Sequence, residues 1–278
     1  SASAADCEDV DGGTETISAD CQNLSITGDS PNVTIDSGVT IDSTAANAVA
    51  TPDATNAIIT NNGTISAATN RAFRTSGGDV DQLINNGTIT AAGGNEGIRS
   101  NSNITTLTNV GTISADNKYA IFNRGSGTIG TLDNSGTISA SGDFAIRNDG
   151  SITTLTNTGT FLASGGTQTD IQNAGTITTI NNLQGKSGSN PVTFTKSLPT
   201  NYNVIVNPEN KIDSTDDYGQ IEFSSFSGQT NTSLNFGVHS TSTIAGSTTY
   251  SSVLSGLSSS NIASGTSDSF VEPGSSKR

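Results

Sequence analysis

The sequence predicts an all-β chain: a right-handed parallel β-helix with three strands per turn and a C-terminal β cap or junction module. Three observations support this prediction. A short phrase recurs along the chain, first as NNGTISAA from Asn61 and then as NNGTITAA from Asn85. Three series of apolar residues share its period, which is about 24 residues. Only 31% of the 278 residues are hydrophobic, which favours a thin core over the thick interior of a globular enzyme.

The three apolar series define the strands of each turn. They are Ile65, Ile89, Ile113 and Ile138; Phe73, Ile98, Ile121, Ile146 and Ile171; and Leu83, Leu107, Leu132, Leu155 and Ile180. Each member is flanked by Thr, Ser or Asn, an alternation typical of strands. Turns of a solenoid stack about 4.8 Å apart, so each series should form one interior column. A leucine-rich repeat would need several leucines and a helical segment per unit, and independent hairpins would not keep three series in phase.

Glycine and asparagine recur in phase with these series. Glycine precedes the first strand of each unit, at Gly63, Gly87, Gly111, Gly136, Gly159 and, after a short step of 16 residues, Gly175. We expect these glycines to form tight corners with positive φ. The asparagines two residues earlier should stack as a ladder of side-chain amides, at Asn61, Asn85, Asn109, Asn134 and Asn157. The repeat is thus interpreted as architecture and not as a catalytic motif.

The chain start predicts a cap and export. Residues 1–56 are expected to form an N-terminal cap and irregular first turns, followed by the regular β-helix over residues 57–184. Ala2-Ser3-Ala4 reads as the end of a secretory signal peptide, or as a chance run of small residues. Cys7 and Cys21 favour a disulfide, because no further Cys or His lies nearby to complete the alternative, a metal site.

The period disappears after Gly185. Residues 185–260 alternate strongly and contain most of the aromatic residues, which predicts a different β-module, a hairpin or sandwich stacked on the final turn. Residues 261–278 are expected to form a disordered tail or linker.

Charge and hydropathy exclude two classes of partner. The formal net charge is -14, whereas phosphate binding needs a basic patch, so we expect no nucleic-acid partner. No apolar run approaches the roughly 20 residues of a membrane helix.

The chain resembles the passenger domains of bacterial autotransporters, the type V secreted proteins. The resemblance lies in the LTNxGTI turns of residues 57–184 and in LPTNYNVIV, YGQ and TTYSSVLSGLSSSNI within residues 198–262. It implies export and display at the outer membrane of a Gram-negative bacterium, commonly for adhesion or surface structure. In that family a membrane barrel follows the passenger; residues 1–278 contain no such barrel, and membrane contact is expected only through one. No position matches the motif of an enzymatic passenger.

The sequence offers few groups for catalysis. The single histidine, His239, lies far from Gly28-Asp29-Ser30, a phrase that resembles the nucleophile motif of trypsin-like proteases but continues with Pro31-Asn32 in place of glycines. Polysaccharide-cleaving β-helices need clustered carboxylates or a basic residue in a groove, and charges are sparse in the regular turns. We therefore expect no enzymatic activity.

Two acidic clusters are either calcium ligands or ordinary exposed surface charge. They are Asp6, Glu8, Asp9 and Asp11, and Asp213, Asp216 and Asp217. Calcium prefers several oxygen ligands, but neither cluster forms an EF-hand loop, and the glycine-rich calcium nonapeptide is absent. We expect exposed acids, with no bound metal and no cofactor.

Two outward surfaces are candidate binding faces. One is a Thr-x-Thr-like array of Thr64, Ser66, Thr88, Thr90, Thr112, Ser114, Thr137, Ser139, Thr176 and Thr178. It resembles the ice-binding face of β-helical antifreeze proteins, although Thr also stacks well in any sheet and Leu162 interrupts the array. The other consists of Arg74, Arg99 and Arg147, which directly follow the second apolar series and so point outward, as a substrate clamp or as ordinary solvated charge.

These observations predict a non-enzymatic secreted or cell-surface protein, an adhesin or a structural spacer. The alternatives are an ice-binding or glycan-binding β-helix and, third, a polysaccharide-cleaving one. Expected partners are a host or neighbouring cell surface, a glycan, or a second copy, because an incompletely covered solenoid end can template a filament.

Overall fold

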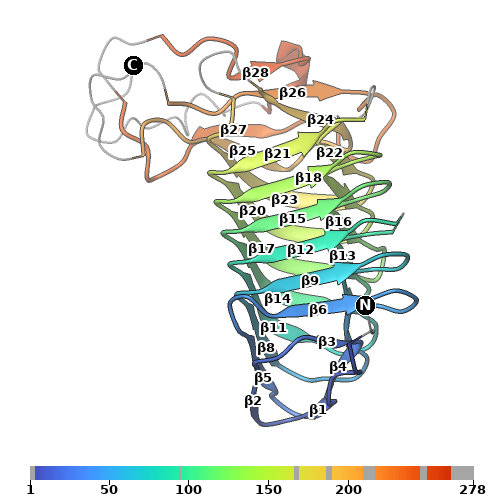
Figure 1. Cartoon of the computed structure of the whole chain (residues 1–278). Helices are drawn as coiled ribbons and strands as arrows, with labels where there is room; N and C mark the ends of the chain where they lie inside the picture. The colour runs from blue at the N-terminus through green and yellow to red at the C-terminus, as the bar shows by residue number, and fades with distance from the viewer. Residues whose placement is uncertain are drawn as a thin grey trace.

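The computed structural model describes residues 4–93, 95–165, 169–185, 190–208, 217–244 and 249–263. Within these residues the chain winds into a solenoid of three parallel β-sheets (Figure 1). Successive strands of the chain belong to different sheets, so each strand pairs with the strand one turn before it and the strand one turn after it. The predicted all-β fold class, with three parallel strands per turn, is confirmed.

The described strands divide among the three sheets as follows. The first sheet contains β1 (Val10–Asp11), β4 (Leu24–Thr27), β7 (Val49–Thr51), β10 (Phe73–Thr75), β13 (Ile98–Ser100), β16 (Ile121–Asn123), β19 (Ile146–Asn148), β22 (Ile171–Asn173), β24 (Val192–Lys196), β26 (Ile221–Ser224) and β28 (Leu254–Ser255). The second contains β2 (Thr14–Ile17), β5 (Asn32–Ile35), β8 (Ala57–Asn61), β11 (Val80–Asn85), β14 (Asn103–Asn109), β17 (Thr128–Asn134), β20 (Ser151–Asn157), β23 (Thr176–Asn182), β25 (Asn201–Val204) and β27 (Asn235–Val238). The third contains β3 (Cys21–Gln22), β6 (Thr40–Ser43), β9 (Thr64–Ala67), β12 (Thr88–Ala91), β15 (Thr112–Ala115), β18 (Thr137–Ala140) and β21 (Thr160–Ala163), and a short 3-10 helix, η2, spans Ser259–Asn261.

The predicted apolar columns are present in the interior. In the third sheet Ile65 pairs with Ile89, Ile89 with Ile113, and Ile113 with Ile138, and all four side chains are fully buried. The phenylalanine–isoleucine series and the leucine series form equivalent columns in the first and second sheets. The second sheet adds a fourth interior column that the sequence analysis did not identify, formed by Val80, Ile104, Ile129, Ile152 and Ile177.

The asparagine ladder also lies in the interior. Each amide nitrogen donates to the amide oxygen of the next turn, from Asn61 to Asn85 at 2.8 Å and onward as far as Asn182. A second ladder, which was not predicted, runs from Asn123 through Asn148 to Asn173. These are the last residues of three successive strands of the first sheet, β16, β19 and β22. Because a buried amide is stabilised only when its hydrogen bonds are made, the ladders fix each turn in register with its neighbours.

Glycine is required at the corners because the backbone of the preceding turn lies very close. The expected positive φ is not found. None of Gly63, Gly87, Gly111, Gly136 or Gly159 has a positive φ. A Cβ at Gly111 would instead lie closer than 3.0 Å to the carbonyl oxygen of Gly87, which accepts the backbone hydrogen bond of Thr112. The corners therefore stack too tightly for any side chain.

Gly175, at the end of the short glycine step, lies at a different corner. It precedes β23 in the second sheet, and a Cβ there would meet the carbonyl oxygen of Gly150. Thr176 and Thr178 consequently lie in the second sheet and not in the third-sheet threonine array, so their assignment to that array is wrong.

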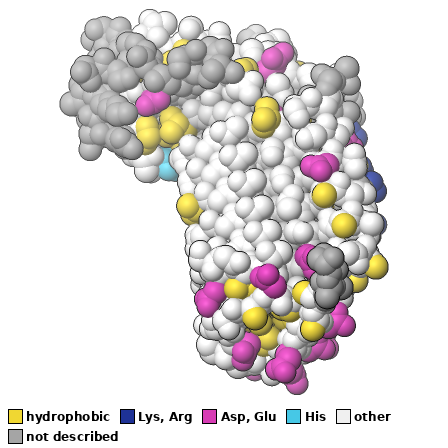
Figure 2. All heavy atoms as spheres, viewed as in Figure 1, with side chains coloured by type: hydrophobic (Ala, Val, Ile, Leu, Met, Phe, Trp, Pro, Cys, Tyr) yellow, Lys and Arg dark blue, Asp and Glu magenta, His cyan; other side chains and the backbone are white. Residues whose placement is uncertain are grey.

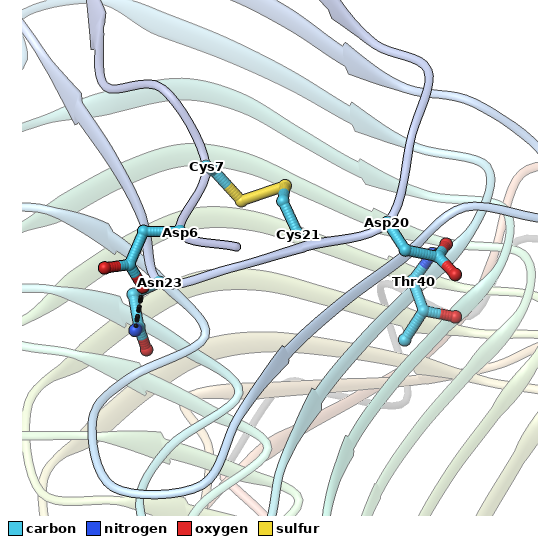
Figure 3. The surroundings of a disulfide bond; sticks show 6 residues. All are labelled: Asp6, Cys7, Asp20, Cys21, Asn23 and Thr40. Carbon is cyan, nitrogen blue, oxygen red and sulfur yellow. Dashed lines mark hydrogen bonds between the residues drawn. A yellow bond between two sulfur atoms is a disulfide. The ribbon is translucent and has the colours of Figure 1, made fainter. Parts of the chain in front are cut away.

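The N-terminal end is closed by the predicted disulfide. Cys7 and Cys21 are bonded, and Cys21 begins β3, the outermost strand of the third sheet (Figure 3). Asn23 donates a side-chain hydrogen bond to Asp6 at 2.7 Å, and the carboxylate of Asp20 accepts the backbone N–H of Thr40 at 2.8 Å. The terminal strands β1, β2 and β3 are two, four and two residues long, so little unpaired edge remains for another chain to extend.

The C-terminal part continues the solenoid. Within the described residues it contains one antiparallel, hairpin-like pairing, between Val206 and Tyr218, and no sandwich. β24, β26 and β28 extend the first sheet in parallel, and β25 and β27 extend the second, whereas the third sheet ends at β21. Large aromatic side chains fill the core beyond that point: the ring centres of Phe194 and Phe223 lie 5.3 Å apart, and those of Tyr202 and Phe223 lie 6.2 Å apart. The period is lost here because a turn with two sheets needs no third apolar series. Among the described residues no helix is long and apolar enough to cross a membrane.

Candidate functional site

The structure does not bring the catalytic candidates together. Asp29 and Ser30 lie between β4 and β5 near the N-terminal end, where Asp29 accepts a hydrogen bond from Thr55 at 2.7 Å. His239 follows β27 near the C-terminal end, and its Nδ1 lies 2.8 Å from the Thr241 hydroxyl. Burial lowers the pKa of His239, so the imidazole favours its neutral form.

The acidic clusters do not gather into a metal site within the described part of the chain. No group of three His, Cys, Asp or Glu side chains there is close enough to hold a metal ion. Asp213 and Asp216 lie outside the described residues. The carboxylate of Asp6, in the other cluster, accepts a hydrogen bond from the side-chain amide of Asn23.

The threonine array is a regular outward surface on the third sheet. Thr64, Thr88, Thr112 and Thr137 align in one column, and Ser66, Thr90, Ser114 and Ser139 align in the next. The Ser114 hydroxyl donates to the Thr90 hydroxyl at 2.8 Å. The array ends where Asp42 pairs with Ser66 and where Leu162 pairs with Ser139. This sheet faces the viewer in Figures 1 and 2, and the middle of the face in Figure 2 is mostly uncharged, whereas acidic side chains gather toward its lower end.

The arginine column lies on the outer surface of the first sheet. β10, β13, β16 and β19 each have three residues, and the middle one points away from the core. Their register aligns Arg74 with Arg99, Arg99 with Phe122, and Phe122 with Arg147. The three arginines named by the sequence analysis thus share one column, with an aromatic ring between the second and the third.

Residues next to these strands widen the column into a surface, which we call the arginine face. It comprises Arg71, Arg74, Arg99, Arg124 and Arg147 together with Glu96, Tyr119, Phe122, Phe144 and Asp149. The aromatic members are not among the residues predicted from the sequence. Their signal was present, because Arg71, Glu96, Tyr119 and Phe144 each stand two residues before an inward residue of the second apolar series.

Aromatic rings form the centre of the arginine face. The ring centre of Tyr119 lies 5.2 Å from that of Phe122 and 6.0 Å from that of Phe144. The guanidinium carbon of Arg147 lies 5.2 Å from the Tyr119 ring centre and 5.0 Å from that of Phe122, and the Arg99 carbon lies 5.6 Å from Phe122. These distances are within the range of cation–π attraction, so the rings hold two of the arginines in place.

Two acids pair with part of the charge. The carboxylate of Glu96 is buried and accepts a hydrogen bond from Arg71 Nε at 3.0 Å. Its other oxygen, Oε1, lies 3.7 Å from Arg99 Nη1. Asp149 accepts from Arg147 Nε and Nη2 at 3.1 and 3.0 Å. Arg147 also donates to the Tyr119 hydroxyl at 2.7 Å, so its hydrogen-bonding capacity is largely used within the protein.

The ionisable groups respond to this environment in opposite directions. Burial, and then repulsion by Arg71, lowers the pKa of Arg99, and Arg124 and Arg74 act in the same direction. The hydrogen bond to Asp149 raises the pKa of Arg147. Burial raises the pKa of Tyr119 and of the neighbouring Asp143. The carboxylate of Glu96 acts in the opposite direction on the pKa of Arg99.

Two arginines of the face have no acidic partner within the described part of the chain. Neither Arg74 nor Arg124 lies within 4.0 Å of a carboxylate there. The Nε of Arg74 is buried without a hydrogen-bond partner, and Arg124 is exposed. In Figure 2 the basic side chains appear at the right-hand edge of the solenoid.

The arginine face has the opposite charge to the chain as a whole. It gathers every arginine that the structure describes. The five arginines against Glu96 and Asp149 of the face and the neighbouring Asp143 leave a balance of +2, whereas the chain carries -14. Half-buried guanidinium groups beside aromatic rings can bind anions and pack against flat apolar surfaces. No family model, curated protein or solved structure matches the chain.

Proposed function

We propose that this protein is a non-enzymatic, exported surface protein in which the solenoid is a rigid spacer and the arginine face is an adhesive surface. The proposal depends chiefly on one observation: all the described arginines of an acidic chain lie on one face. Scattered surface charge would not produce this arrangement. The disulfide between Cys7 and Cys21 supports export, since disulfides persist in oxidising compartments.

A cell-attachment assay tests the adhesive role. Beads coated with the purified chain should attach to bacterial or host cells, and attachment should fall when Arg74 and Arg124 are both replaced by Gln. Lys196→Gln is the control, because Lys196 lies on β24, outside the arginine face. Equal attachment of the double variant and the wild type would reject the role of this face.

The absence of catalysis is also part of the proposal. The pure protein should release no reducing ends from polysaccharides, and detectable cleavage of any polymer would overturn this part. Light scattering over a concentration series tests self-association: mass that grows with concentration supports filament formation, and a constant monomer mass dismisses it.

Ice binding is a second candidate function, for the third-sheet threonine array. The observation that favours it is the aligned, nearly uncharged lattice of hydroxyl groups from Thr64 to Ser139. Thermal hysteresis that is lost in Thr112→Tyr but kept in Thr153→Tyr, an exposed position on β20, would support it. Freezing without hysteresis would dismiss it.

A further inference from the structure

We propose that the arginine face binds an anionic glycan, a polysaccharide whose rings carry carboxylate or sulfate groups at intervals. This inference rests on the proposed function, because it names the ligand class of the same surface. It depends on the unpaired arginines, on the aromatic rings beside them and on the charge of the rest of the chain.

The first step concerns Arg74 and Arg99, whose arrangement is unfavourable for folding. They are register partners on β10 and β13, one turn apart, and Glu96 is paired with Arg71 and Arg99 but not with Arg74. Like charges directly opposite each other on neighbouring strands are destabilising. An anion bound at the outer nitrogens of the two guanidinium groups would reduce this repulsion.

The second step concerns the chemistry of the anion. Guanidinium groups present a planar fork of donors that fits the oxygens of a carboxylate or sulfate. Arg74 and Arg147 stand three turns apart in one column, about 14 Å at the usual strand spacing. A ligand that runs along the solenoid axis can therefore contact several arginines at once, with Arg124 at its edge.

The third step concerns the rings between the charges. Tyr119 and Phe144 are stacked and only half-buried, so part of each ring remains accessible on the arginine face. The negative face of an aromatic ring packs favourably against polarised C–H groups, which line one face of many sugar rings. An alternation of anionic groups and sugar rings thus matches the alternation of arginine and aromatic residues.

The fourth step separates a glycan from a nucleic acid. A nucleic acid carries a charge on every phosphate and is held by many basic contacts. Here Glu96 and Asp149 lie among the arginines, and the whole chain carries -14. A sparsely charged polymer meets less repulsion from such a surface than a densely charged one.

Direct binding measurements with defined polymers test the inference. We expect the immobilised chain to bind polygalacturonate or dextran sulfate, with affinity that falls as salt is added, and to ignore uncharged dextran. The first polymer carries carboxylates and the second sulfates, so the two arms identify the anionic group. Arg124→Gln should weaken binding about tenfold, the usual effect of losing a hydrogen bond to a charged group, and Arg124→Lys should weaken it less.

Matched variants separate the arginine face from general effects. Lys196→Gln removes the same charge elsewhere and should change affinity less than twofold. Phe144→Ala should weaken binding, whereas Leu162→Ala, an exposed apolar residue on the third sheet, should not. Unchanged thermal midpoints establish that the variants fold, and the exposed Arg124 keeps the test usable where replacing the half-buried Arg74 impairs folding.

The outcomes distinguish this inference from the proposed function. Equal binding of charged and uncharged dextran, or stronger binding of DNA than of either anionic glycan, would overturn the inference. Beads that attach to cells through the arginine face without binding any anionic glycan would overturn it while leaving the adhesive function intact. If the beads attach to no cell but the purified chain binds an anionic glycan, the inference stands and the adhesive role fails.

Discussion

The amide nitrogen of Asn109 donates a hydrogen bond to the amide oxygen of Asn134, 2.8 Å away and one turn further along the solenoid. Asn109 accepts an equivalent bond from Asn85 at 2.7 Å and also donates to the carbonyl oxygen of Gly111 at 3.2 Å. The amide–amide bonds are buried, so water cannot replace a missing partner there. The ladder thus makes each turn depend on the turns before and after it.

Replacement of Asn109 by Ala should lower the free energy of unfolding by about 2–5 kcal/mol, because the buried amide of Asn85 loses its acceptor in the ladder and the buried amide oxygen of Asn134 loses its donor. Chemical denaturation measures this change. Asn86→Ala is the control, since the hydrogen bond from Asn86 to Asn62 is exposed and its loss should change stability by less than about 0.5 kcal/mol. Equal effects of the two substitutions would show that the ladder contributes nothing specific.

Replacement of Gly111 by Ala should destabilise the solenoid by about 1–3 kcal/mol or more, because the new methyl group would press against the carbonyl oxygen of Gly87. Thermal unfolding followed by circular dichroism measures the loss. Gly125→Ala is the matched control, because the nearest atom to a Cβ there is 3.9 Å away. If both variants melt together with the wild type, close packing at the corners is not what requires glycine.

Reduction of the Cys7–Cys21 bond should lower stability by about 3 kcal/mol, the loop-closure value for a separation of 14 residues. The reason is that the bond restricts the unfolded chain and holds β3 against the third sheet. Thermal melts with and without a reductant measure the effect. The double variant Cys7→Ser/Cys21→Ser should match the reduced wild type and should no longer respond to the reductant; a response would mean that the reductant acts elsewhere.

Asp170 should make stability fall as pH rises. Its carboxylate accepts the backbone N–H groups of Ala163 and Thr193 at 2.8 and 2.9 Å where the third sheet ends. Burial nevertheless raises its pKa above the ordinary value of 3.8, so the folded chain holds this proton more tightly than the unfolded chain. The contribution of Asp170 is therefore full below pH 3.8 and is lost as pH rises through the raised folded pKa.

Unfolding free energies of the wild type and of Asp170→Asn, measured from pH 3 to 7, test this direction. The wild type should lose stability relative to the variant as pH rises, because Asn cannot ionise. Asp133→Asn on β17 controls for the removal of one charge. A difference that stays constant, or that grows with pH, contradicts the raised pKa.

The stacking of strands decides which parts of this fold could be predicted from the sequence. In a parallel solenoid, residues one period apart become neighbours, so the columns of Ile65, Phe73 and Leu83 could be predicted from spacing alone. The same spacing placed Asn61 over Asn85 and Arg74 over Arg99. The C-terminal turns could not be predicted in this way, because their strands pair without a repeated phrase.

The sequence by itself determined the register of the regular turns, and hence which side chains share a column. The tertiary structure alone decided what those side chains do there. It showed that the corner glycines are required by a neighbouring carbonyl oxygen, that Thr176 belongs to another sheet, and that Arg147 lies against Tyr119 and Phe122. The physical reason is that a period specifies separation along the axis, about 4.8 Å per turn, whereas contacts across a turn depend on corner geometry and side-chain conformation, which the period does not encode.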